Sequence, residues 1–133
     1  MREILFRGKR TDNGEWIYGD LMQNVDCIKI REQEKDVKHI AKSFEIDLET
    51  VGQYTDLADK NGKRIFEGDI IKRFWLGAEI TYCVQYDGEN TRFIGKAMNK
   101  RGFTTFDNDG EMFEIIGNIH DNKSLLNNQE AGE

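Results

Sequence analysis

The sequence predicts a mainly β fold of N-terminal hairpins followed by a small C-terminal barrel, and three observations carry this prediction. Apolar and polar residues alternate in several short runs, which is the pattern of strands buried on one side. Asn-Gly pairs at 13–14 and 61–62 separate such runs, and both residue types tolerate the positive φ of tight hairpin turns. Proline is absent from all 133 residues, which suits a chain dense in hydrogen-bonded strands.

The first element expected is a hairpin over residues 2–22. Ile4 and Phe6 alternate with polar neighbours before the first Asn-Gly pair, and Trp16 and Tyr18 follow it. A tight turn between two alternating runs is a strong local signal for two antiparallel strands.

The next part of the sequence allows two interpretations. Alternation favours strands over 26–32 and 37–47, joined by a charged turn. Apolar residues between positions 37 and 44 also recur at the spacing of one helix face. We prefer the strands, but periodicity leaves the choice between helix and strand open for 33–44.

Short strands separated by turns predict a small barrel over 66–120. The turn spacing predicts the barrel but does not fix its topology. Strands are expected at 70–75, 79–86, 91–98 and 112–120, with a polar loop at 99–111.

A protein of this length is expected to form a single domain over 1–133. Within it we predict a β-hairpin region at 1–65, the barrel at 66–120, and a C-terminal turn with a flexible tail at 121–133. At most one short helix is expected, beginning after Asp121 or Asn122.

Charge and hydropathy narrow the classes of partner. The net charge of −6 opposes general attraction to nucleic acid or to an anionic membrane. No apolar run approaches the roughly 18 residues of a membrane-spanning helix, and the first residues carry no targeting signal. We therefore expect a cytoplasmic protein with no membrane partner.

No set of residues predicts catalysis or metal binding. His39 and His120 are the only histidines, and Cys27 and Cys83 lie far apart with no Cys-x-x-Cys motif. The acidic run 107–111 matches only part of a calcium loop. The sequence therefore predicts no enzyme, no catalytic residue, no cofactor and no metal.

The segment 91–106, here called the basic segment, stands out because it holds four cations and no acidic residue. Lysine, arginine and interleaved phenylalanine would grip single-stranded nucleic acid through its backbone and by stacking on its bases. The alternative is a solvated strand face with its phenylalanines in the core, since alternate strand residues point to opposite faces. We prefer the solvated face. The cations are Arg92, Lys96, Lys100 and Arg101, interleaved with Phe93, Phe103 and Phe106.

Four further aromatic residues are candidates for a protein interface, where aromatic side chains are enriched. They are also the expected core of a small barrel, and we prefer this second interpretation. The residues are Trp16, Tyr18, Tyr54 and Trp75.

Three separated blocks of the sequence resemble the YopX family. They are REILFRGKRTDNGEWIYGDL near the start, TVGQYTDLADKNGKRIFEGDII in the middle and FEIIGNIHDN near the end, and they occur in the family's order. The resemblance implies a β-rich protein with an SH3-like C-terminal barrel, a phage or prophage origin and a capacity for self-association. It does not imply an activity. One departure is Asp-Leu-Glu at 47–49, where the family commonly has proline.

Together these observations predict a non-catalytic phage or prophage accessory protein in the cytoplasm of the host cell. It would act through contact with a host or phage protein or through self-association. The alternative is a nucleic-acid-binding module that uses the cations of the basic segment.

Overall fold

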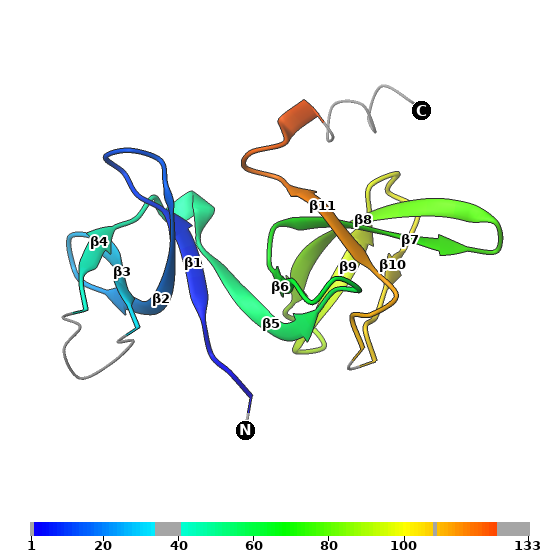
Figure 1. The fold of residues 1–133 in the computed structure, drawn as a ribbon, viewed down its shortest axis with the longest axis horizontal. Helices are drawn as coiled ribbons and strands as arrows, with labels where there is room; N and C mark the ends of the chain where they lie inside the picture. The colour runs from blue at the N-terminus through cyan, green and yellow to red at the C-terminus, as the bar shows by residue number, and fades with distance from the viewer. Residues whose placement is uncertain (1, 34–40, 108, 125–133) are drawn as a thin grey trace. The chain divides into compact units, whose positions relative to one another are not determined.

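The computed structural model describes residues 2–33, 41–107 and 109–124 (Figure 1). It confirms the mainly β fold, because the strands form two antiparallel sheets. Helical backbone in the described residues is confined to η1 (Leu48–Thr50) and to positions 123–124. The protein divides into two compact units, unit 1 (Met1–Tyr54) and unit 2 (Thr55–Glu133).

Unit 1 is built on the predicted N-terminal hairpin. Strands β1 and β2 are antiparallel, with Lys9 opposite Trp16, and Gly14 takes a φ of 74° in the turn between them. Strand β3 pairs with β2, and β4 pairs with β3. Residues 34–40 lie outside the described residues, so the structure assigns strand only to the last part of the predicted strand 37–47. The strands are β1 (Phe6–Lys9), β2 (Trp16–Gln23), β3 (Ile28–Glu32) and β4 (Ser43–Glu45).

The core of unit 1 consists of isoleucines from three segments. Ile17, Ile30 and Ile46 are buried against one another. Strands β2 and β3 approach closely at Gly19, where a Cβ atom would collide with the backbone carbonyl of Arg31. A glycine is therefore required at this point of the sheet.

Strand β5 (Gly52–Ala58) crosses the boundary between the units. Its first residues pair with β1, with Gly52 opposite Arg7, and β6 (Arg64–Phe66) follows β5 in the strand order β4-β3-β2-β1-β5-β6.

Unit 2 contains a five-stranded antiparallel sheet in the order β10-β9-β8-β7-β11. Three of its strands were predicted to within one residue at each end. The prediction of a polar loop over 99–111 was wrong in one respect, because this range contains the short edge strand β10. The last strand is shorter than the predicted 112–120. The SH3-like topology stays a prediction. The strands are β7 (Asp69–Trp75), β8 (Ala78–Asp87), β9 (Arg92–Ala97), β10 (Phe103–Thr104) and β11 (Glu114–Asn118).

One face of this sheet carries the main core of unit 2. Ile71, Tyr82, Val84 and Phe113 are buried there, and Phe113 meets Tyr82 edge-to-face at 6.1 Å between ring centroids. The opposite face has a smaller cluster around Cys83, a free thiol whose pKa is raised by burial.

Buried Asp59 fastens the 59–63 turn to β11. Its Oδ1 accepts hydrogen bonds from the backbone N–H groups of Asn61 and Lys63, both at 2.9 Å, and its Oδ2 accepts one from Ile115 at 3.0 Å. Burial alone would raise the pKa of Asp59, but these N–H donors outweigh it and lower the pKa. This carboxylate therefore stabilises the fold by joining two segments that are far apart in sequence.

Candidate protein-interaction surface

The β7–β8 hairpin extends past the strands on either side of it (Figure 1). Strand β11 pairs with β7 only as far as Lys72, and the register of β9 with β8 begins at Tyr82. Beyond these points β7 and β8 pair with each other alone, and Trp75 opposite Ala78 is the last pair. Within the described residues, the end of the hairpin is therefore free of neighbouring strands.

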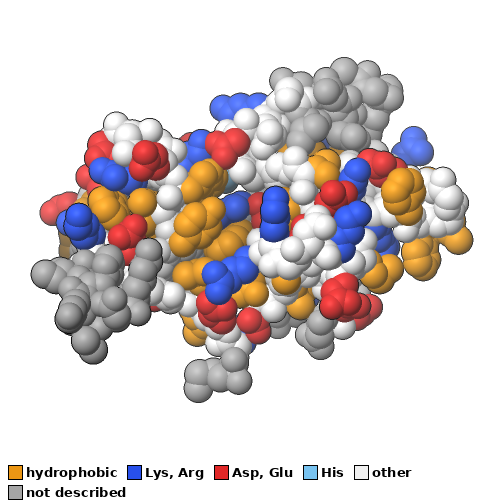
Figure 2. All heavy atoms as spheres, viewed as in Figure 1, with side chains coloured by type: hydrophobic (Ala, Val, Ile, Leu, Met, Phe, Trp, Pro, Cys, Tyr) orange, Lys and Arg blue, Asp and Glu red, His pale blue; other side chains and the backbone are white. Residues whose placement is uncertain are grey.

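Three consecutive large apolar side chains lie at this end: Phe74, Trp75 and Leu76, here called the apolar tip. Their relative exposures are 70%, 49% and 90%. Hydrophobic side chains are visible at this end of the hairpin in the space-filling view (Figure 2). Phe74 and Trp75 are consecutive on β7 and therefore point to opposite faces, so the three side chains surround the end of the hairpin. Single exposed apolar residues are normal on protein surfaces, but several at one end of a hairpin indicate an interaction site or an aggregation liability.

The turn of the hairpin makes Leu76 unusual. The loop has two residues, Leu76 and Gly77, with φ values of 51° and 79°. Two-residue turns with positive φ favour Asn-Gly or Asp-Gly, because a bulky side chain is strained in the left-handed region. The backbone of Leu76 is therefore strained while its side chain gains nothing from burial. The requirements of folding do not explain a leucine here.

Arg73 links the apolar tip to the core of unit 2. Its guanidinium carbon lies 5.0 Å from the ring centroid of Trp75, 5.7 Å from that of Tyr82 and 5.3 Å from that of Phe113. Tyr82 and Phe113 are buried, whereas Trp75 is half exposed. The cation–π contacts restrain the exposed indole.

The two cations at the base of the hairpin have different surroundings. Lys72 lies 3.9 Å from a carboxylate oxygen of Glu79 and 3.6 Å from one of Glu114. Within the described part of the protein, Arg73 has no carboxylate within salt-bridge distance, and its buried Nε has no hydrogen-bond partner. Among the residues that the structure describes, Arg73 is thus in contact with aromatic rings and has no counter-ion.

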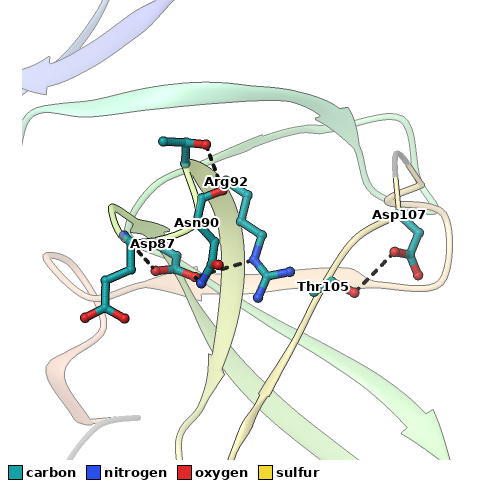
Figure 3. A network of polar contacts seen from close by, with 7 residues as sticks. Asp87, Asn90, Arg92, Thr105 and Asp107 are labelled. Carbon is teal, nitrogen blue, oxygen red and sulfur yellow. Dashed lines mark hydrogen bonds and ion pairs between the residues drawn. The ribbon is translucent and has the colours of Figure 1, made fainter.

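The basic segment is placed on β9, β10 and the turn between them. Arg92 is partly neutralised, because its Nε lies 3.4 Å from Oδ2 of Asp87 (Figure 3). Hydrogen bonds, the strongest from the Asn90 side-chain amide, lower the pKa of Asp87, so this carboxylate stays charged beside the arginine.

The other three predicted cations are exposed, one on β9 and two in the turn that leads to the edge strand β10. Lys96 lies opposite Phe103 in the β9–β10 register, whereas Lys100 and Arg101 occupy the turn. In the described residues none of the three is in an ion pair. Phe106 is buried in the core, so Phe103, which is 57% exposed, is the phenylalanine of the segment most open to stacking.

The interpretation of the four aromatic candidates as core residues was right for Tyr54 and wrong for Trp75 and Tyr18. Tyr54 is buried, whereas Trp75 and Tyr18 are about half exposed. Trp16 is partly buried, with Arg7 and Lys9 over its ring. Trp75 escapes the core because β7 continues past its neighbours. The signal in the sequence was the run Phe-Trp-Leu directly before Gly77, which breaks the alternation of the strand.

An acidic groove of about 660 Å³ lies elsewhere in unit 2, between the end of β5 and the loop before β11. Its acidic lining residues are Asp56, Asp59, Asp109 and Glu111. The Asp59 carboxylate is already engaged by backbone N–H groups. The described residues contain no group of three metal-ligating side chains with the geometry of a metal site.

The sequence profile of the family described as YopX protein matches residues 5–127. The chain belongs to the YopX family. This result confirms the resemblance drawn from the three blocks, and both β7 and β8 lie inside the matched range. A comparison with curated proteins gave no match.

A solved structure is similar to this YopX family member over nearly its whole length. The crystal structure of protein EF1440 from Enterococcus faecalis has a TM-score of 0.56 and 22% identity, and the match covers 95% of this protein and 99% of that one. At this identity the likeness concerns the fold alone. No helix in the described residues is long and apolar enough to cross a membrane.

Proposed function

We propose that this YopX family member is a non-catalytic binding protein that inserts its apolar tip into an apolar pocket of a partner protein. The observation that carries the proposal is Leu76, a bulky residue kept at positive φ with its side chain 90% exposed. Residues held in strained conformations cluster at functional sites, so a strained and exposed leucine supports a binding role for this end of the hairpin.

The composition of the apolar tip supports a protein as the ligand. Tryptophan is the residue type most enriched among the side chains that dominate binding energy, and such anchors fill desolvated pockets. Because Arg73 restrains the indole of Trp75, less side-chain freedom is lost on binding.

Charge argues against the other apolar surface that a cell offers, the lipid bilayer. Cytoplasmic leaflets carry negative charge and attract clusters of lysine and arginine. This protein has a net charge of −6, and Glu79 follows the tip closely on β8. The same net charge opposes contact between two copies of the protein. The proposed partner is therefore a different protein.

The place of action is part of this proposal. The resemblance that identified the family implies a phage or prophage origin, and we infer an accessory role in the cytoplasm of the host cell. A partner encoded by the host or by the phage fits this role equally well.

Photo-crosslinking from the apolar tip tests the proposal. A photoreactive phenylalanine analogue is placed at position 76 of the full-length protein, and a second version carries it at position 48, where exposed Leu48 lies in η1. We expect one protein to crosslink at 76 and not at 48, and its purified form to bind the wild type. Crosslinks that are equal at both positions, or that form only to a second copy, would contradict the proposal.

The nucleic-acid alternative rests on a separate observation. Lys96 on β9 and Lys100 and Arg101 in the following turn are exposed and have no carboxylate partner in the described residues, and Phe103 is exposed opposite Lys96. These features suit backbone contacts and base stacking. The salt dependence of binding discriminates this function from protein binding.

A further inference from the structure

We propose that Arg73 binds a carboxylate of the partner protein, so that the partner carries an aspartate, a glutamate or a free C-terminal carboxylate beside the pocket for the apolar tip. The inference rests on the proposed function and adds the chemical identity of the polar contact. Arg73 becomes the residue that determines which apolar pockets are accepted.

The first argument is the position of Arg73. Strand residues two apart point to the same face, so Arg73 and Trp75 lie side by side on the face that carries the core cluster of unit 2. The 5.0 Å separation between the guanidinium carbon and the indole centroid shows that the two groups are in contact. A pocket that receives Trp75 therefore reaches Arg73.

The second argument is the unused hydrogen-bonding capacity of Arg73. A guanidinium has five N–H donors in a fixed plane and no acceptor. Contacts with the rings of Trp75, Tyr82 and Phe113 neutralise no charge. In the described residues the buried Nε lacks a partner and lies out of reach of a ligand, so the terminal N–H groups of the guanidinium are the donors that a partner can use. The side chain is half-buried, so part of its desolvation is complete before binding.

The third argument is the match between guanidinium and carboxylate. A carboxylate accepts two parallel N–H bonds from arginine, and this geometry gives both strength and orientation. Neighbouring Lys72 does not compete for the ligand, because Glu79 and Glu114 already flank it. A neutral acceptor would satisfy a donor but would leave the charge of Arg73 uncompensated.

Selection from a library of random disulfide-constrained peptides tests the inference. The library is selected on the immobilised full-length protein and, in parallel, on Trp75→Ala. Peptides enriched on the wild type alone bind the apolar tip. We expect them to combine apolar residues with Asp or Glu, and replacing that acid by its amide to weaken binding about tenfold, as expected for a hydrogen bond to a charged group.

A double-mutant cycle assigns the effect to Arg73. The acidic peptide and its amide version are each measured against the wild type and Arg73→Gln, and the amide penalty is expected only for the wild type. The acid-to-amide change is made in the peptide and not in the protein. The loss of affinity that it causes on the wild type therefore does not depend on whether Arg73→Gln folds.

The possible failures are distinguishable. If no enriched peptide depends on Trp75, the proposed function fails together with this inference. If binding depends on Trp75 but shows no preference for an acid, the proposed function stands and the carboxylate inference is overturned. An amide penalty of the same size on Arg73→Gln would also overturn it.

Discussion

The guanidinium carbon of Arg73 lies 5.0 Å from the ring centroid of Trp75, and the same group lies 5.3 Å from the ring of buried Phe113. A half-exposed indole is thereby connected to the core of unit 2 through one cation. This arrangement separates residues that stabilise the fold from residues that remain available for binding. Several experiments can test that separation.

The first prediction compares Trp75 with Phe113. Trp75→Ala is expected to lower the free energy of unfolding by about 1 kcal/mol, the size of a partly exposed cation–π contact. Phe113 is 1% exposed, so Phe113→Ala is expected to cost about 3–5 kcal/mol. Urea unfolding of the two variants measures both values. Equal losses would show that Trp75 is a core residue.

The second prediction concerns Asp59 and pH. Its pKa is lowered in the folded state, so its stabilising contribution is present above the unfolded pKa and is lost as pH falls through the folded pKa. Asp59→Asn places an amide against three N–H donors and is expected to cost about 1–3 kcal/mol at neutral pH.

Denaturant unfolding at pH 7 and at about pH 3 gives, at each pH, the difference in free energy of unfolding between the wild type and Asp59→Asn. The difference is expected to narrow as pH falls below the ordinary aspartate pKa of about 4, where the carboxylate of the unfolded state begins to protonate while that of the folded state is still charged. A gap of constant size would mean that charge on Asp59 does not contribute to stability.

The third prediction discriminates the nucleic-acid alternative. Fluorescence anisotropy with labelled single- and double-stranded oligonucleotides across a salt series gives the number of phosphates neutralised. If the basic segment binds single strands, replacing Lys96, Lys100 and Arg101 with Ala is expected to reduce the salt slope by about 2, since each contact contributes about 0.7.

Arg92→Ala serves as the internal comparison. Because Asp87 already accompanies this arginine, its removal is expected to change the slope less than removal of Lys96. A slope unchanged by the triple replacement, or no binding at low salt, would remove the basic segment as a nucleic-acid site.

The hairpins could be predicted from sequence because their signals are local. Asn13-Gly14 forces a turn, and alternation on either side assigns each residue to a face. The edge strand β10 could not be predicted in this way, because two residues, Phe103 and Thr104, are too few to show a period. Its position depends on pairing with β9.

The sequence did not predict the apolar tip, because its exposure depends on tertiary structure. Alternation assigns Trp75 to the core face of β7, and its side chain does lie on that face. The exposure of Trp75 depends on where β9 and β11 stop, which is fixed by segments far along the sequence. The contact of Arg73 with Phe113 joins residues 40 positions apart, and no local sequence pattern predicts it.

The measurement that tests the central claim most directly is the combined stability and binding of Leu76→Asn. Asparagine tolerates positive φ better than leucine, so relief of the strain is expected to raise the free energy of unfolding by about 1 kcal/mol. The same change removes the most exposed side chain of the apolar tip, and affinity for the crosslinked partner is expected to fall. Leu48→Asn, at an exposed leucine in η1, is the matched control and should leave affinity unchanged. A stabilised protein that no longer binds is the predicted result, whereas undiminished binding by Leu76→Asn would contradict the account.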